Sequence, residues 1–168
     1  AEIDKKLVDY GKKDARTQLL CSFAGIAELS AVGLLMNMPH MDTTPDAAHL
    51  ASYWGLHPVF KKSGDGAMVA RMSKAGRNQP RAILFMVTLA AICHNPLIRE
   101  KYRRLVYKEG WKRLPAIGVC MHKIARIVYG MLRTNTPFNP SIDKANQTKK
   151  VEMSREKAQR AEEQRRQR

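Results

Sequence analysis

The stretch PRAILFMVTLAAICHNP, residues 80–96, decides the fold. From Arg81 to His94 it is apolar on nearly every side of a helix, a pattern typical of a helix buried at the centre of a domain. Asn78 and a proline in the first turn favour its start, and Asn95-Pro96 ends it and begins another helix. Its most apolar part, residues 82–93, is far shorter than the ~20 residues that cross a membrane. We therefore predict a domain built around one central helix.

Apolar residues at helical spacing predict further helices on both sides of this one. Proline, glycine and capping residues mark where each begins or ends. Residues 56–78, by contrast, are rich in glycine and have no helical period, so we expect a loop there, with a short extended segment around Val59-Phe60. The predicted fold is all-α, a compact domain of five or six helices. The helices are expected over residues 2–20, 29–38, 47–54, 78–94, 96–110 and 115–134.

The charge of the chain is strongly unbalanced. Its 168 residues include 30 Lys or Arg and 15 Asp or Glu, a formal net charge of +15, and 44% of them are hydrophobic. That apolar content suffices for a core, whereas so large a positive excess usually serves a polyanionic partner. Nucleic acid is the commonest such partner, and an anionic membrane is the weaker alternative. Residues 59–113 hold thirteen Lys or Arg and three acidic residues, so the binding surface is expected there.

The cysteines and histidines exclude several classes of site. Cys21, Cys93 and Cys120 are odd in number and have no Cys-x-x-Cys spacing, so they form neither a disulfide framework nor a zinc site. We expect all three to be reduced core residues, which indicates a reducing, cytoplasmic compartment. The five histidines are scattered, and no phosphate-binding or dinucleotide-binding glycine motif is present. We therefore expect no metal and no cofactor on this chain.

A serine in the glycine-rich loop is the candidate nucleophile. Ser63 is followed by Gly64, which would let a bulky phosphodiester approach, and nearby cations could neutralise the charge that develops at phosphorus. By itself, a Ser-Gly pair in a loop is far more often a turn than a nucleophile. The residues expected to bind the phosphates around this serine are Lys61, Lys62, Arg71 and Lys74.

A small-residue turn near the amino end is a second candidate phosphate contact. Ala24-Gly25 joins two predicted helices, as in a helix-hairpin-helix, whose turn amides bind a DNA phosphate without reading bases. A plain helical hairpin has the same pattern. The residues leave these two interpretations open.

Several motifs, in order and spacing, resemble one family. These are LASYWGLHP (residues 50–58) followed by KSG (62–64), RMSKAGRN (71–78), PRA (80–82), AICHNP (91–96), Tyr102, Ala125-Arg126 and FNP (138–140). Together they are similar to the carboxy-terminal transposase domain of the Piv-type, insertion-sequence 110 family, and residues 23–26 resemble that family's helix-hairpin-helix entry. The resemblance extends from Leu19 to Pro140.

The resemblance implies a DNA recombinase that is often guided by a structured RNA and that works as a homo-oligomer. It implies that Ser63 attacks DNA and forms a phosphoserine link, and that an amino-terminal RuvC-like domain with four acidic residues binds magnesium. We expect that acidic domain to be absent from these 168 residues, and the chain to be inactive alone. The expected localisation is cytoplasmic and nucleoid-associated, in a bacterium or archaeon. The full set of expected DNA- or RNA-binding residues is Lys61, Lys62, Gly64, Arg71, Lys74, Arg77, Arg81 and Gly25.

The sequence departs from the family's pattern in three places. The usual Pro-Gly-Ile-Gly is AGIA at residues 24–27, the usual Arg-Gly-Asn is AGRN at 75–78, and GDGA at 64–67 is less basic than expected. We expect a connector helix over residues 1–18, the transposase domain over 19–140 and a polar tail over 141–168. The helix-hairpin-helix-like part is expected over 19–40 and the serine-loop core over 41–140.

Two other interpretations stay open. The chain could be a non-catalytic nucleic-acid-binding module or transposase remnant, or a basic helical adaptor for an acidic protein. Nucleic-acid binding that weakens with salt would argue against the adaptor.

Overall fold

The computed structural model describes residues 2–61, 69–142, 145, 152–153 and 156. The chain divides into two units, residues 1–138 and 139–168. The helices and strands below belong to the first unit, and most of the predicted polar tail lies outside the described residues.

The amino-terminal part forms three helices, α1 (Glu2–Lys13), α2 (Ala15–Cys21) and α3 (Glu28–Met36). The prediction of one helix over residues 2–20 was wrong, because Asp14 breaks it. The Asp14 carboxylate accepts hydrogen bonds from the Arg16 amide at 3.4 Å and the Thr17 hydroxyl at 3.2 Å, and so caps a new helix. The break lets α1 pack against α3, where a Cβ on Gly11 would lie 2.5 Å from a methyl of Val32.

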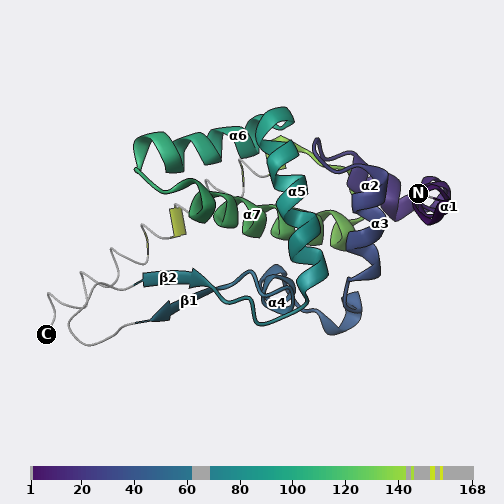
Figure 1. The fold of residues 1–168 in the computed structure, drawn as a ribbon, viewed down its shortest axis with the longest axis horizontal. Coiled ribbons are helices and arrows are strands. Elements are labelled where there is room, and N and C mark those ends of the chain that lie inside the picture. Colours follow the sequence, from purple (N-terminus) through teal and green to yellow (C-terminus); the bar gives the residue numbers. More distant parts are fainter. Residues whose placement is uncertain (1, 62–68, 143–144, 146–151, 154–155, 157–168) are drawn as a thin grey trace, which may run out of the picture. The chain divides into compact units, whose positions relative to one another are not determined.

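Helix α5 (Asn78–His94) is the central helix, in contact with α3, α6 and α7 (Figure 1). Leu84, Val87 and Ala91 are buried on its inner face. It is not covered on every side, however, because Met86 and Leu89 are 63% and 38% exposed. The central position predicted from its composition is confirmed, whereas burial all around is not.

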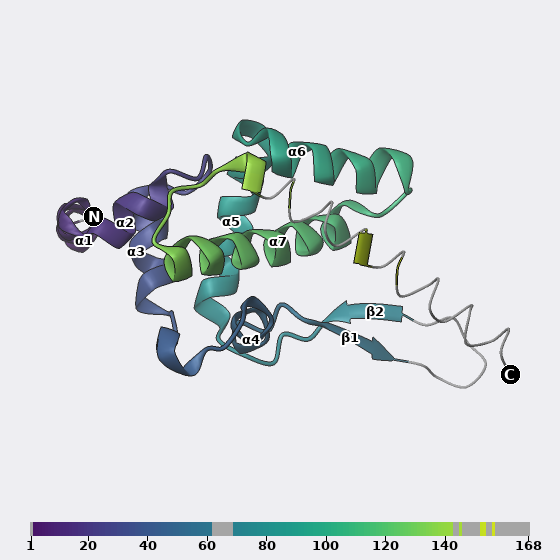
Figure 2. The ribbon, with the colours of Figure 1, turned by 180° about the vertical axis from the view of Figure 1, so that it is seen from behind.

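Two helices follow α5. Asn95 caps α6 (Pro96–Arg103) by accepting the Leu97 amide at 3.0 Å, and a π-helical turn, η2 (Arg104–Lys108), extends it. Helix α7 (Arg113–Thr134) then runs through the core and ends at Asn135, which has a left-handed φ of 49°. Figures 1 and 2 both show α7 between α6 and the β-hairpin. The starts predicted at Pro96 and near Pro115 are confirmed, because these signals are local.

The predicted loop contains a small sheet. After the 3₁₀ turn η1 (Met41–Thr43) and helix α4 (Ala47–Tyr53), strand β1 (Pro58–Lys61) pairs antiparallel with β2 (Val69–Met72). Val59 lies opposite Arg71, and Lys61 lies opposite Val69. The extended segment expected around Val59-Phe60 is confirmed. The second strand corrects the prediction of a loop from there to Asn78.

The core joins α2 through α5 to α7. Trp54, Phe23, Leu20 and Ile124 are fully buried, and the ring of Phe138 meets Phe23 edge to face at 4.8 Å between centroids. This arrangement confirms the predicted all-α fold. None of the described helices alone is long and apolar enough to cross a membrane. Residues Asn78–His94 and Pro96–Lys108 meet that length and composition only as a pair, which is bent by 95°.

Candidate nucleic-acid interface

Two chain segments cross where the β-hairpin joins the helical core, and we call residues 53–57 and 73–77 the hairpin base. The Ser73 amide donates to the His57 carbonyl at 2.9 Å, and the Lys74 amide donates to the Gly55 carbonyl at 3.0 Å. The Arg77 amide completes the set with a 3.3 Å bond to the Tyr53 carbonyl. These bonds continue the hairpin ladder and fix the strands to the end of α4.

Glycine is needed at two positions of the hairpin base. A Cβ on Gly76, whose φ is 152°, would lie 2.5 Å from the Tyr53 oxygen and 2.7 Å from the Gly55 nitrogen. A Cβ on Gly55, at φ 66°, would lie 3.0 Å from the Ala75 oxygen. The two backbones therefore pack more closely than side chains would allow.

The guanidinium of Arg81 joins the two segments of the hairpin base by hydrogen bonds. Its Nη1 donates to the Trp54 carbonyl at 3.3 Å and the Gly76 carbonyl at 3.2 Å, and its Nη2 donates to Asn78 Oδ1 at 3.3 Å. Three acceptors from the protein itself give Arg81 a structural role. Whether it also contacts DNA stays a prediction.

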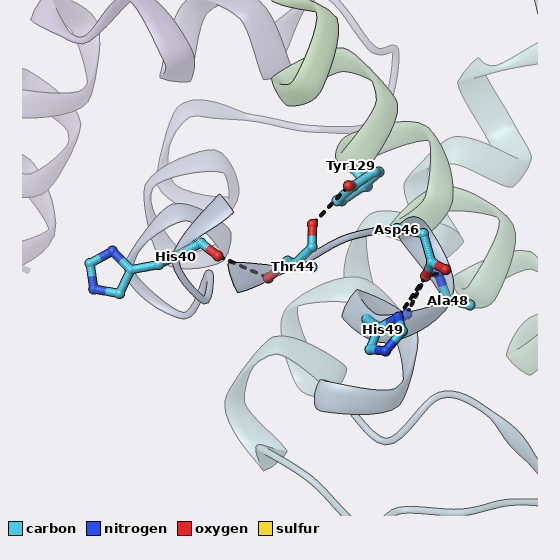
Figure 3. Close-up of polar contacts among 6 residues, drawn as sticks. All are labelled: His40, Thr44, Asp46, Ala48, His49 and Tyr129. Carbon is cyan, nitrogen blue, oxygen red and sulfur yellow. Dashed lines mark hydrogen bonds and ion pairs between the residues drawn. The ribbon is translucent and has the colours of Figure 1, made fainter. Parts of the chain in front are cut away.

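Helix α4, which supplies one half of the hairpin base, is anchored at its start (Figure 3). The buried Tyr129 hydroxyl of α7 donates to the Thr44 carbonyl at 2.9 Å. Asp46 then accepts the amides of Ala48 and His49, each at 2.8 Å, and the His49 ring nitrogen lies 3.0 Å from the same oxygen. These contacts hold the pKa of Asp46 below its ordinary value, with the hydrogen bond from the His49 amide as the largest cause.

Three of the predicted cations lie exposed around the hairpin base. Arg71 is on β2, Lys74 has a left-handed φ of 56°, and Arg77 immediately precedes α5. The Arg77 guanidinium lies 5.5 Å from the centre of the Tyr53 ring, a cation–π distance that orients it. Asp65 is the one acidic residue in the sequence from Ala47 to Arg99, so this surface is strongly positive.

The amino end of α5 adds a further feature that suits phosphate. Its N-cap residue is Arg77, and no side chain there accepts a hydrogen bond from the first-turn amides. The helix dipole favours anions at such an end, although Pro80 in the first turn has no N–H to donate. The amino end of a helix and two exposed cations, Lys74 and Arg77, therefore lie on one short stretch of chain.

The predicted nucleophile lies outside the described residues. Lys61, the last residue of β1, pairs with Val69, the first residue of β2, and the segment between them, residues 62–68, includes Lys62, Ser63 and Gly64. For Lys61 the structure places the backbone in β1. The roles predicted for these four residues therefore stay predictions.

Gly25 lies in the turn between α2 and α3, as the sequence predicts, but it faces α5. With its φ of 116°, a Cβ there would lie 2.9 Å from the backbone and side chain of Ala91. This close approach explains the glycine by packing. Its predicted phosphate contact stays a prediction.

The described residues do not offer a metal site. No group of three or more His, Cys, Asp or Glu among them could hold an ion. The family resemblance places magnesium in an amino-terminal RuvC-like domain, and that expectation stays a prediction.

The cysteines differ from the prediction of three core residues. Cys120 is buried, Cys21 is half-buried and Cys93 is exposed on α5. Burial raises the pKa of Cys120 to about 11, and it also raises that of Cys21. The prediction for Cys93 was wrong, because the outer face of α5 is uncovered.

Sequence reasoning missed part of the hairpin base. It took Tyr53, Trp54 and Gly55 as a helix end, whereas their carbonyls accept the bonds that fix Lys74, Arg77 and Arg81. A local signal existed in Gly55 and Gly76, since paired glycines flanking a hairpin indicate a close backbone crossing.

Comparison with known proteins agrees with the motifs. Residues 17–103, just over half of the chain, match the model of the Transposase IS116/IS110/IS902 family. The pilin gene-inverting proteins of Moraxella bovis and Moraxella lacunata are each 29% identical over 129 residues, which is 76% of this chain and 40% of theirs. An insertion element IS110 protein of 43.6 kDa from Streptomyces coelicolor is 28% identical over 118 residues, 70% of this chain and 29% of its own length. The chain thus spans two fifths or less of these relatives, and it belongs to the IS116/IS110/IS902 transposase family.

Proposed function

We propose that this chain is the DNA-handling part of a transposase or site-specific recombinase, which binds the phosphate backbone at the hairpin base and supplies Ser63 as the nucleophile. Family membership and the pilin gene-inverting relatives support DNA rearrangement as the overall activity. The observation that carries the proposal is the set of exposed cations, Arg71 on β2 with Lys74 and Arg77 at the hairpin base, on the hairpin whose strands flank the Ser63 segment in the sequence.

The rigid base matters because a nucleophile must be held in line with the phosphorus that it attacks. Misplacement by about 1 Å can cost roughly 100-fold in rate. Backbone hydrogen bonds and the Arg81 guanidinium fix both strands, so a phosphate held by Lys74 and Arg77 would keep a constant position relative to the strand ends.

The proposed step exchanges one phosphate ester for another. Ser63 Oγ would form a bond to phosphorus and lose its proton, while the bond from phosphorus to a deoxyribose oxygen breaks and that oxygen gains a proton. A serine hydroxyl needs a base or a metal for this attack. We propose that a group beyond the described residues activates it, and that a guide RNA and a second copy take part in the whole recombinase.

The experiment compares two serines of the same hairpin. Ser63→Ala in the recombinase that contains this chain should abolish inversion or transposition of a reporter segment. Ser73→Ala is the matched control, because the one side-chain hydrogen bond of Ser73 among the described residues is the bond that its Oγ accepts from the Ala75 amide at 3.2 Å. The 168-residue chain carrying Ser63→Ala should bind DNA as the unaltered chain does. Recombination that survives Ser63→Ala would refute the nucleophile assignment.

A non-catalytic nucleic-acid-binding role is the second candidate. It is favoured by the exposed cations together with the lack of a metal-binding group among the described residues. Under this alternative, Ser63→Ala and Ser73→Ala would both leave every measurable activity unchanged.

A further inference from the structure

A second basic surface lies on α6 and η2, where the predicted site has no residue. A groove of about 550 Å³ is lined there by four cations, one acidic residue, a tyrosine and a proline: Arg99, Arg103, Arg104, Lys108, Glu100, Tyr107 and Pro96. Figures 1 and 2 show α6 and the β-hairpin on opposite sides of α7. The groove is therefore separate from the hairpin base.

The π-helical turn sets which side chains face the groove. Leu105 is 4% exposed and fixes the turn to the core, whereas Arg103, Arg104, Tyr107 and Lys108 all face solvent. Arg99, Arg103 and Tyr107 follow at intervals of four residues, which places them along one face of a helix. π-Helical turns are rare and often mark functional sites.

The surface has more positive charge than the protein itself neutralises. From Arg99 to Arg113 the sequence has seven Lys or Arg and two Glu. Glu109 pairs with Arg104 at 3.2 Å, and Arg99 donates to the carbonyls of Ile92 and Cys93 at the end of α5. Arg103 and Lys108 have no such ion pair within the described part of the chain, so they are available to an external anion.

The electrostatics of Lys101, on the same helix, are consistent with this crowding of cations. The pKa of Lys101 is lowered, first by burial and then by the positive charge of Arg104. Repulsion of this kind is relieved when a polyanion binds.

Aromatic side chains accompany the cations. Tyr107, which lines the groove, is 75% exposed, and Trp111, three residues beyond the end of η2, is 43% exposed. Exposed rings among cations are typical of surfaces on which unpaired bases stack while the cations hold the phosphates. A duplex keeps its bases stacked on one another, so it cannot use the Tyr107 ring in this way.

We propose that the groove of α6 and η2 binds single-stranded nucleic acid, with a base stacked on Tyr107 and its phosphates held by Arg103 and Lys108. The proposal adds a second ligand site to the proposed function, and it rests on that function in so far as both require nucleic-acid binding. RNA and DNA single strands share the chemistry that the groove recognises.

The test measures binding of the 168-residue chain to three labelled probes by fluorescence anisotropy: twelve-nucleotide oligo(dT), twelve-nucleotide oligo(U) and a twelve-base-pair DNA duplex. Tyr107→Ala should weaken binding to a single strand by roughly 5- to 150-fold and leave duplex binding unchanged. Tyr107→Phe keeps the ring and should bind like the unaltered chain. If Tyr107→Ala weakens binding to oligo(U) more than binding to oligo(dT), the natural ligand is RNA. If it weakens binding to oligo(dT) more, the natural ligand is DNA.

Charge variants give an independent readout. Lys108→Gln should reduce the slope of log affinity against log salt by about 0.7 for the single strand. Arg133→Gln, an exposed cation at the end of α7, is the matched control and should leave single-strand affinity unchanged.

Each other outcome overturns the proposal. Equal single-strand binding by Tyr107→Ala and the unaltered chain, with duplex binding present, removes the groove proposal and leaves the proposed function standing. Equal losses for single strand and duplex exclude base stacking. A chain that binds none of the probes contradicts both proposals.

Discussion

At the scale of single residues, the hairpin base depends on positions without a side chain. Gly76 combines a φ of 152° with a backbone contact that leaves no room for a Cβ. Gly130 in α7 is the opposite case, because nothing lies within 4 Å of where its Cβ would be. The two glycines therefore predict opposite effects for the same substitution.

Gly76→Ala should lower the free energy of unfolding by roughly 1–3 kcal/mol, because alanine strains the backbone and meets the Tyr53 oxygen. Gly130→Ala should raise it by about 0.5–1 kcal/mol, because alanine favours a helix interior. Urea unfolding of both variants measures these changes. A neutral Gly76→Ala would show that the two segments of the hairpin base are not packed as described.

The cysteines predict a difference in reactivity. Burial raises the pKa of Cys120 to about 11, so its thiol stays neutral and covered near pH 8, whereas Cys93 is exposed. Brief treatment of the native chain with iodoacetamide, followed by peptide mass spectrometry, should find Cys93 alkylated and Cys120 intact. Alkylation of Cys120 at the rate of Cys93 would contradict the burial of α7 in the core.

At the scale of elements, the start of α4 is held by a charged cap. The pKa of Asp46 is lower in the folded chain than in the unfolded one, so its charge stabilises the fold above the unfolded pKa. That contribution is lost as the pH falls through the lowered folded value, below about 4.

Asp46→Asn keeps a capping oxygen but removes the charge. The unaltered chain should be more stable than this variant at pH 7, and the difference should shrink as the pH falls below about 4. Urea midpoints measured from pH 7 to pH 3 test this. A difference that does not change with pH would show that the charge contributes nothing to the cap.

The elements also show what sequence predicts and what it does not. The beginnings of α4 and α6 were predictable, because Asp46 and Asn95 bond to amides two or three residues away. The break at Asp14 had a similar local signal, but the apolar stripe of residues 2–20 masked it. The bond from Arg81 to the Trp54 carbonyl was not predictable, because the two residues are 27 apart in the sequence. Strand β2 was missed because it is four residues long and lies in a stretch rich in glycine.

The site was predictable to a similar degree. The basic region was found from charge alone, and Arg71, Lys74 and Arg77 are indeed exposed together near the hairpin base. Residue types could not show that Arg81 bonds inward, since a guanidinium serves carbonyl groups as well as it serves phosphate. The groove at Tyr107 was missed because the helix pattern accounted for every residue of α6.

At the scale of the whole molecule, the chain has a net charge of +15, and two surfaces of the first unit gather exposed cations, the hairpin base and the groove of α6 and η2. At the hairpin base, Gly55 and Gly76 let two backbone segments pack closely. We propose that this surface holds the DNA phosphate that Ser63 attacks. The other surface contains the exposed ring of Tyr107 and is proposed to hold a single strand of nucleic acid. Nucleic-acid binding at these two surfaces would explain why the chain has such an excess of positive charge.

Salt dependence of DNA binding tests this account most directly. Affinity of the 168-residue chain for a short duplex should fall linearly in a plot of log affinity against log salt, with a slope of about −3 or steeper if Arg71, Lys74 and Arg77 each neutralise a phosphate. Replacing all three by Gln should flatten that slope by about 3. An affinity that does not change with salt, or a triple variant whose slope equals that of the unaltered chain, would contradict phosphate binding at the hairpin base.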